Sequence, residues 1–328
     1  MTTKRPYLID LNDEKNWLYP MFFKNPDGSP GEDQRTINIG EGPHKLMCFT
    51  DSVIYPRGAE EQGKMPFHEH HTGYEYFFLD EGSLDLYVGG KKARVGAGSI
   101  VFYQPYQAHG IVFHEPSKLR GFYHDFKNSD TAYERALLRE YRPEVLENRD
   151  YFTKILSVEH DTIPREPIVS EEIPVEQMSA VRSITRPLET FALEGVTMKM
   201  LTTRWENGGV NELWAAEMAP GFYAEWTPYP METEMYYITA GEVEFRVYDD
   251  TFVASRECLV RIPKFAEHSI HVLKQAVMYD IGGQTRWQGL LEDYTSIRTY
   301  DPNRAKDAET MEKLKARYGC QIRSFGLK

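Results

Sequence analysis

The chain has 328 residues, 41% of them hydrophobic, and carries 38 Lys and Arg against 50 Asp and Glu, a formal net charge of −12. An acidic chain without a basic patch is not expected to bind nucleic acid, and no apolar run approaches the about 20 residues that cross a bilayer. Because the length is about twice that of a usual domain, two domains are expected. A small molecule is the expected partner, with no nucleic acid and no membrane.

The N-terminus and the cysteines both favour a cytoplasmic protein. A Lys-Arg pair near the start is followed by acidic residues where a secretory signal would need an apolar stretch. Cys48, Cys258 and Cys320 are scattered, with neither the spacing of a disulfide framework nor a CxxC pair. This use of cysteine is typical of a reducing compartment.

The stretch HEHHTGYEYFFLDEG, residues 68–82, places three histidines and a glutamate within eight positions. In a β-strand alternate side chains share a face, so His68 and His70 would point one way and Glu69 the other. A turn at residues 72–73 can reverse the chain and bring Glu75 beside the two imidazoles. The stretch therefore predicts a cluster of polar side chains on one face of a strand pair.

A further histidine, His109, opens the apolar segment GIVF after a proline turn, and its return could bring it to the same centre. Three nitrogens and one oxygen suit one divalent metal ion, Mn, Fe or Zn, with Ni and Co also possible. Such a set leaves one or two positions for water or substrate. We predict that four residues are metal ligands and carry the catalysis: His68, His70, Glu75 and His109. The alternative is a hydrogen-bonded polar cluster, but burying four titratable groups without a cation is costly.

Other residues near this stretch are weaker candidates. His71 should face away from the ligands, at the surface or in a supporting role. In KLRGFYHDF one alternate set faces inward: Arg120, Phe122 and His124, or Gly121, Tyr123 and Asp125. His124 and Tyr123 are therefore the candidate general bases. Six aromatic residues could line a pocket for a ring-shaped substrate, although core packing is their commoner use: Phe67, Tyr76, Phe77, Phe78, Phe102 and Tyr103.

Between residues 127 and 190 the pattern changes. Ser129 or Asp130 can cap a short helix through DTAYERALLREYRP, and the residues that follow are rich in Pro, Glu and Ile without clear periodicity. This region is expected to be a linker that packs against the rest of the chain.

The first stretch recurs 159 residues later. Residues 75–82 align without a gap to residues 234–241, and the same offset carries His109 onto His268. Around both copies, short strands rich in Tyr, Phe, Val and Ile are separated by turns, as in an all-β sandwich or barrel. Duplication of a small jelly-roll barrel is the simplest explanation.

The second copy retains only half of the predicted ligands. Glu234 and His268 remain, whereas Thr227 and Tyr229 stand at the positions of the first two histidines. Two protein ligands rarely hold a catalytic metal, so Glu234 and His268 are expected to form a buried structural pair.

Near the C-terminus, Asp301 and Pro302 are well placed as the N-cap and first residue of a helix. The following AKDAETMEKLKARYG has the charge pattern and final glycine of one amphipathic helix. This helix is expected to pack on the domain before it.

The repeated stretch resembles the first motif of the cupin superfamily, HxHx4Ex6G, with these residues in register: His68, His70, Glu75 and Gly82. The segment from Gly98 through Pro105 to His109 resembles the second motif. Two departures are small: Gly63 lies one residue closer to the motif than usual, and the glycine usual between Pro105 and His109 is missing.

The resemblance covers roughly residues 46–126 and 191–285. It implies a bicupin, an all-β chain of two jelly-roll barrels (double-stranded β-helices). The resemblance does not cover the linker or the two ends, where the short linker helix and the C-terminal helix are expected from their capping residues. Four regions are expected: 1–126 with the metal-binding barrel, 127–190 as linker, 191–285 as the degenerate barrel, and 286–328 as the helical tail. Bicupins often associate, so a homo-oligomer is expected.

Proteins similar to this bicupin include dioxygenases, decarboxylases, aminohydrolases and sugar isomerases, so the motif implies a metal and leaves the reaction open. The first hypothesis is hydrolytic C–C cleavage of a cyclic or linear 1,3-dicarbonyl by metal-bound hydroxide, similar in kind to the manganese-dependent cyclohydrolase step of phloroglucinol breakdown. The alternatives are an iron-dependent dioxygenase that cleaves a ring or a dicarbonyl, a sugar isomerase, and a non-catalytic protein that binds a small ligand.

Overall fold

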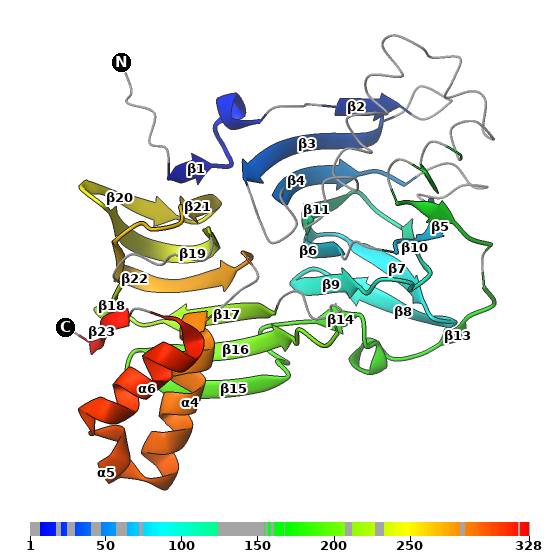
Figure 1. Cartoon of the computed structure of the whole chain (residues 1–328). Coiled ribbons are helices and arrows are strands. Elements are labelled where there is room, and N and C mark those ends of the chain that lie inside the picture. Colours follow the sequence, from blue (N-terminus) through cyan, green and yellow to red (C-terminus); the bar gives the residue numbers. More distant parts are fainter. Residues whose placement is uncertain are drawn as a thin grey trace. The chain divides into compact units, whose positions relative to one another are not determined.

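The computed structural model of the chain describes residues 7–17, 21–24, 30–40, 47–56, 64–71, 75–123, 154, 157–158, 161–166, 168–206, 212–226, 233–282, 286–320 and 322–327. The chain divides into two compact units (Figure 1). The first unit spans Trp17–Ser183, and the second combines Met1–Asn16 with Ile184–Lys328. Both units consist mainly of antiparallel strands, which confirms the predicted all-β class.

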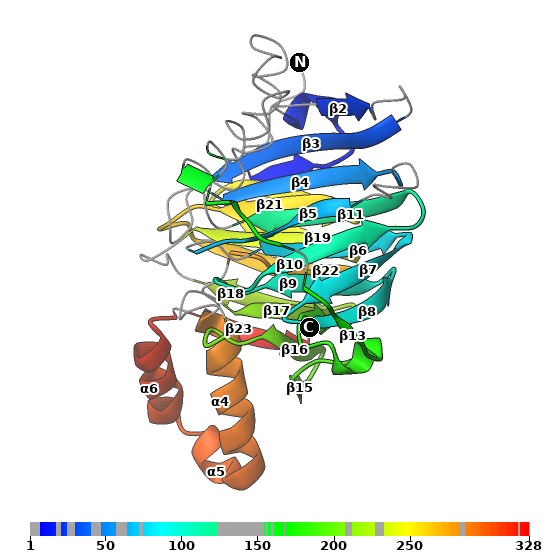
Figure 2. The same ribbon diagram turned by 90° about the vertical axis from the view of Figure 1, so that its right-hand side faces the viewer.

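The first unit contains two sheets, with strand orders β12-β5-β10-β7-β8-β13 and β14-β9-β6-β11-β4-β3-β2 (Figures 1 and 2). Its strands are β2 (Met21–Lys24), β3 (Pro30–Gly40), β4 (Met47–Ile54), β5 (Lys64–Glu69), β6 (Glu75–Glu81), β7 (Ser83–Val88), β8 (Lys91–Gly96), β9 (Ser99–Tyr103), β10 (His109–Phe113), β11 (Ser117–Tyr123), β12 (Ile163–Pro164), β13 (Glu171–Glu172) and β14 (Val181–Arg182). Figure 2 shows β2, β3 and β4 side by side.

The core of the first unit receives alternate side chains from both sheets. Phe77 and Leu79 from β6 join Leu84 and Leu86 from β7 in one buried cluster. Because the side chains of successive strand residues point to opposite faces, those of the other residues of β6 point away from this cluster. Gly82, with a φ of +84°, makes the tight connection between the two strands.

The predicted linker region contributes strands to the first unit. β12, β13 and β14 pair with β5, β8 and β9, respectively. A short 3₁₀ helix, η2 (Val175–Gln177), precedes β14. The helix expected after Ser129 and Asp130 lies outside the described residues. Segments as short as two residues carry no periodic signal, so these strands are not visible in the sequence.

The described residues of the second unit form a ten-stranded sheet, three α-helices and one 3₁₀ helix. Its elements are β1 (Leu8–Asp10), the 3₁₀ helix η1 (Glu14–Asn16), β15 (Glu189–Leu193), β16 (Val196–Thr202), β17 (Leu213–Met218), β18 (Phe222–Trp226), β19 (Glu234–Val247), β20 (Asp250–Ser255), β21 (Cys258–Ile262), β22 (His268–Asp280), α4 (Arg286–Tyr300), α5 (Pro302–Ala305), α6 (Ala308–Tyr318) and β23 (Ile322–Leu327).

Two long strands, β19 and β22, allow this sheet to curve. β22 pairs with β17 near Asp280 and with β18 near His268. The register of β19 on β22 shifts repeatedly between Ile238 and Val243, and such bulges bend a strand. The concave side holds a large buried core that includes Trp214, Trp226 and residues of α4.

The N-terminal strand β1 belongs to the second unit, because it pairs with β21 in the register Leu8 to Val260. The domain boundary inferred from the sequence, 1–126, groups these residues with the first barrel instead. A three-residue strand gives no sequence signal of its partner, and the pairing is visible only in the folded chain.

The C-terminal region forms more helix than expected. Asp301 caps α5 as predicted, since its side chain accepts a hydrogen bond from the Arg304 N–H. Asp307 then accepts one from the Glu309 N–H and begins a second helix, α6, which ends at Gly319 in a left-handed conformation. The expected single helix is thus interrupted. Among the described residues, no helix is both long and apolar enough to cross a membrane.

The cap of α6 provides a stability prediction. Replacing Asp307 by alanine removes the acceptor for the Glu309 N–H, so the free energy of unfolding should fall by about 1 kcal/mol. Urea denaturation measures this change, and a variant as stable as the original protein would show that water replaces the cap without loss.

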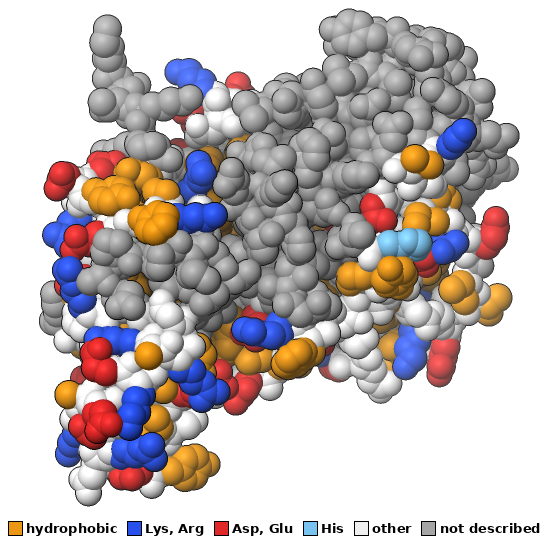
Figure 3. All heavy atoms as spheres, in the orientation of Figure 1, with side chains coloured by type: hydrophobic (Ala, Val, Ile, Leu, Met, Phe, Trp, Pro, Cys, Tyr) orange, Lys and Arg blue, Asp and Glu red, His pale blue; other side chains and the backbone are white. Residues whose placement is uncertain are grey.

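Charged side chains of both signs are interspersed over the exposed faces of these helices (Figure 3). Lys313 and Glu309 form an i,i+4 ion pair at 2.6 Å, and Arg317 contacts Asp293 at 3.0 Å. Leu314 is buried against the barrel. The helices are therefore amphipathic, with a mixed-charge outer face.

Candidate metal centre

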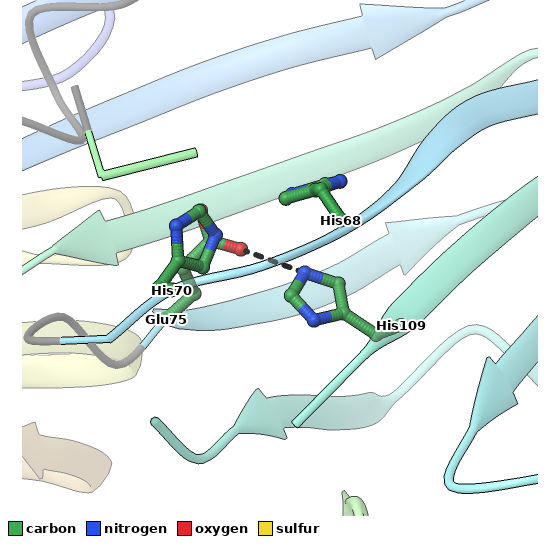
Figure 4. A group of neighbouring side chains, drawn as sticks. All are labelled: His68, His70, Glu75 and His109. Atoms are coloured by element: carbon green, nitrogen blue, oxygen red, sulfur yellow. Dashed lines mark ion pairs between the residues drawn. The ribbon is translucent and has the colours of Figure 1, made fainter. Parts of the chain in front are cut away.

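All four predicted ligands come together in the first unit (Figure 4). His68 lies on β5 and His70 follows its end, while Glu75 opens β6. His109 opens β10 and pairs directly with His68 in the antiparallel register of β10 and β5. One potential ligand atom from each residue lies within 4.8 Å of the others, and the group could hold a metal ion.

The distances within the group are those of side chains facing one centre. Glu75 Oε1 lies 3.5 Å from His70 Nε2, and Glu75 Oε2 lies 3.8 Å from His109 Nε2. The ring of His68 is 4.3 Å from that of His109 and 5.0 Å from that of His70. The three histidines are buried, and Glu75 is mostly buried.

Backbone carbonyl groups fix the tautomers of two histidines. His70 Nδ1 lies 2.8 Å from the Asp161 carbonyl oxygen, and His109 Nδ1 lies 2.8 Å from that of Gln107. Because a carbonyl can only accept a hydrogen bond, each Nδ1 carries the proton and donates it. The Nε2 lone pair of the neutral ring then points to the centre, which is how a metal-binding histidine is prepared.

These Nε2 atoms support a cation at the centre. Those of His70 and His109 are buried, and neither has a hydrogen-bond partner among the described residues. Each faces the Glu75 carboxylate, at 3.5 and 3.8 Å, without forming a hydrogen bond, and a buried polar atom that forms no hydrogen bond costs free energy. A divalent ion held by the four residues would satisfy both atoms, so the donor set fits such an ion.

The charges also favour ligand binding near neutral pH. Burial raises the pKa of Glu75, but the neighbouring imidazoles, His70 first, lower it to about 2, so Glu75 is ionised. Burial, and to a lesser extent the neighbouring His68 imidazole, holds the pKa of His109 well below its usual value, so His109 is neutral. Burial lowers the pKa of His70, and Glu75 raises it by more, so a metal would displace a proton there.

The aromatic candidates divide between two faces of the sheet. Tyr103 stacks on His109 with ring centroids 3.6 Å apart, and Phe77 packs against Tyr103. On the opposite face, Tyr76 stacks on Phe122. Phe78 and Phe102 pack in that layer, and Phe67 contacts Tyr87. Among the described residues, Tyr103 is thus the aromatic candidate whose ring stacks on a predicted ligand, and Phe77 packs behind it.

The structure of β11 shows which way Arg120 and Phe122 point, which the sequence had left open. Leu119 lies in the core, so Arg120 and Phe122 face the other side of the sheet. Arg120 forms ion pairs there with Asp51 at 3.4 Å and Asp80 at 3.3 Å, which removes it as a candidate for substrate contact.

The candidate general bases cannot be placed. The backbone of Tyr123 pairs with Glu75. Its side chain, like the whole of His124, lies outside the described residues, so both remain predictions.

Several supporting residues were not predicted. Glu69 points away from the ligands and binds His71 Nε2 at 2.9 Å and the guanidinium of Arg165. Asp161 contacts both His70 and His71. Asp161 and Arg165 are far from the motif in sequence and lie in the region without periodicity, so no local pattern indicates their role.

In the second unit, Glu234 and His268 form a buried pair with His268 Nε2 3.4 Å from Glu234 Oε2. Trp226 stacks on His268, and the Tyr236 hydroxyl donates a hydrogen bond to Glu234. Thr227 and Tyr229 lie outside the described residues. Among the residues that the structure describes, no second group of three or more potential metal ligands occurs.

The pair has coupled charges. Burial lowers the pKa of His268, but the Glu234 carboxylate raises it by more, so it lies above its usual value. Burial raises the pKa of Glu234, and His268 lowers it by more, so it lies below its usual value. A proton on His268 therefore balances the charge of Glu234.

This pair should stabilise the second unit most in mildly acidic solution. The contribution of His268 is complete below its unfolded pKa of about 6.5 and is lost as the pH rises through its higher folded pKa. That of Glu234 is present above about 4.3 and is lost as the pH falls through its lower folded pKa. His268→Gln should therefore cost more unfolding free energy at about pH 6 than at about pH 9 in urea denaturation. Equal costs would mean that His268 is uncharged in the folded protein.

Comparison with known proteins agrees with this geometry. Residues 52–122 match the Cupin_2 family, described as a cupin domain. The first unit therefore contains a cupin domain, as the motif resemblance implied. No curated protein sequence matches the chain.

The fold of the whole chain is that of a bicupin, as three variants of oxalate decarboxylase from Bacillus subtilis indicate. One aligns with a TM-score of 0.51 and 14% identity over 94% of this chain and 86% of that chain. The second aligns with a TM-score of 0.50 and 13% identity over 84% of this chain and 76% of that chain. The third has the same TM-score and identity, over 94% of this chain and 86% of that chain. The likeness concerns the fold.

Proposed function

We propose that the chain is a metal-dependent cupin enzyme acting on a small, oxygen-rich substrate. One observation carries this proposal: three buried imidazoles and a carboxylate converge, so that one potential ligand atom from each lies within 4.8 Å of the others. Buried groups that are costly without a cation are a signature of a metal site. Manganese, iron and zinc are the candidate ions, with nickel and cobalt also possible.

The charge of the ligand set suits an anionic substrate. Glu75 contributes one negative charge, and three neutral imidazoles contribute none, so a divalent ion keeps a net charge of about +1. In a buried site this charge attracts a singly charged ligand such as the enolate of a 1,3-dicarbonyl, whose two oxygens can chelate. A bound divalent ion would polarise those oxygens and make water acidic enough to attack near neutral pH.

The reaction proposed is hydrolytic cleavage of the C–C bond that joins one carbonyl carbon to the carbon between the two carbonyl groups. Water supplies a hydroxyl group to one carbonyl carbon, which becomes a carboxylic acid, and a proton to the carbon that leaves. The step consumes one water molecule and no oxidant. Within the chain, Glu75 and the imidazoles would hold the ion, and the stack of Tyr103 on His109 fixes the plane of that ring.

Turnover in the absence of oxygen tests this proposal. The full chain loaded with Mn(II), and separately with Fe(II), is incubated with a panel of cyclic and linear 1,3-dicarbonyls and diphenols, and product and oxygen are followed. We expect a dicarbonyl to be cleaved under argon at the same rate as in air. Cleavage only with stoichiometric oxygen uptake would make the protein a dioxygenase. No turnover by the metal-loaded chain would favour a binding role.

A further inference from the structure

The strand that carries the first two ligands has an unusual neighbour. In the sheet order β12-β5-β10, the two-residue strand β12 lies outside β5, which would otherwise be an edge strand. Ile163 pairs with Glu69 and Pro164 with His68. The Arg165 N–H also donates a hydrogen bond of 2.8 Å to the Phe67 carbonyl. A segment about 90 residues downstream therefore covers the outer edge of the ligand strand.

Asp161, at the start of this segment, binds two consecutive residues of the motif. Its backbone carbonyl accepts the hydrogen bond from His70 Nδ1 at 2.8 Å. Both oxygens of its carboxylate lie 3.0 Å from the His71 N–H. One residue thus contacts the ring of a predicted ligand and the backbone beside it.

The backbone conformation of Asp161 makes both contacts possible. Its φ is +50°, in the left-handed region that aspartate and asparagine tolerate better than most residues. Four residues later, Arg165 binds Glu69, which in turn binds His71 Nε2 at 2.9 Å. The segment is therefore attached to β5 at both of its ends.

We propose that Asp161 is a positioning residue of the metal centre, which holds the His70 ring through its carbonyl and the adjoining backbone through its carboxylate. The proposal rests on the proposed function, because it assumes a metal on the four ligands. Asp161 itself would not touch the metal. Groups that orient a metal-binding histidine typically change metal affinity by tenfold to a hundredfold when they are removed.

A covered outer edge also occurs at the corresponding strand of the second unit. There the equivalent strand β18 is also covered on its outer edge, by the C-terminal strand β23, with Trp226 opposite Ile322. Covering of this outer edge is thus common to both units. In the first unit the covering segment also contacts the motif, through the carbonyl and the carboxylate of Asp161.

Cobalt(II) binding to the full chain tests the proposal. Chelator-treated Asp161→Ala, Asp161→Asn and Asp307→Ala variants are titrated with Co(II), and the dissociation constant and visible absorption of the bound ion are recorded. We expect Asp161→Ala to weaken binding by about tenfold and to shift the absorption bands, because it loses the carboxylate that holds the His71 N–H but keeps the carbonyl that binds the His70 ring. Asp161→Asn should stay within about threefold of the original protein, because its amide oxygen can accept from the His71 N–H. Asp307→Ala should bind normally, since this aspartate caps a helix in the other unit.

The outcomes separate the two proposals. Normal binding and an unchanged spectrum in Asp161→Ala would overturn the positioning role and leave the metal site intact. An equal loss in Asp161→Asn would overturn the hydrogen-bond account, whereas no binding by the original protein would overturn both proposals. If Asp161→Ala does not fold, Asp161→Gly replaces it, because glycine keeps the positive φ without the carboxylate.

Discussion

Replacing His109 by alanine should abolish tight metal binding, whereas the same replacement of His268 should not affect it. The two residues occupy equivalent positions, 159 residues apart, and each lies next to a glutamate and stacks on an aromatic ring. Only His109 has two further imidazoles beside it. Removing one of four ligands should weaken binding by at least about a hundredfold, beyond the usual effect of a supporting residue.

Metal content and circular dichroism of the two variants measure this difference. Activity should disappear with the metal in His109→Ala, while the β-sheet spectrum is retained. His268→Ala should lose stability, because it leaves the Glu234 carboxylate buried without its partner, yet keep its metal and turnover. Loss of metal from His268→Ala would show that the metal centre does not lie in the first unit.

Replacing Gly82 by alanine should destabilise the first unit by about 3 kcal/mol or more. Its φ of +84° is unfavourable for any residue with a Cβ. A Cβ built there would lie 2.3 Å from Ser117 Oγ and 2.8 Å from the Pro116 carbonyl oxygen, and a backbone group cannot move aside cheaply. Gly241, the equivalent residue of the second unit, is similarly close to Gln275. The motif glycine is thus required by close packing.

Gly98→Ala is the matched control. Its φ of +82° is nearly the same, but a Cβ would meet no atom within 4 Å. It should therefore cost only the conformational penalty, about 1 kcal/mol. Urea denaturation of both variants separates the two contributions, and equal losses would show that the approach of residues 116–117 to Gly82 is unimportant.

The arrangement of the four candidate ligands could be predicted because it depends on side chains, whose identity and spacing are written in the sequence. Strand alternation places His68 and His70 on one face, and a turn returns Glu75 beside them. The repeat then indicates which residues matter, since the second copy keeps Glu234 and His268 as a pair. The alternation of side chains along a strand and the 159-residue repeat were thus sufficient to predict which four residues come together.

The supporting residues could not be predicted for physical reasons. Asp161 acts on His70 through a backbone carbonyl, which every residue possesses, so its identity carries little information about the contact. Strands β1 and β12 pair with the exposed edges of sheets, and these edges exist only after the barrels have formed. On β11, the residue facing the core depends on a register that the string KLRGFYHDF does not specify.

The stoichiometry of metal binding tests the account most directly. Equilibrium dialysis of the full chain against excess Mn(II), followed by mass spectrometric determination of metal and protein, gives the number of ions per chain. The account predicts one ion per chain, and none in His109→Ala. No bound ion, or a second ion that is lost in His268→Ala, would contradict a single metal centre in the first unit.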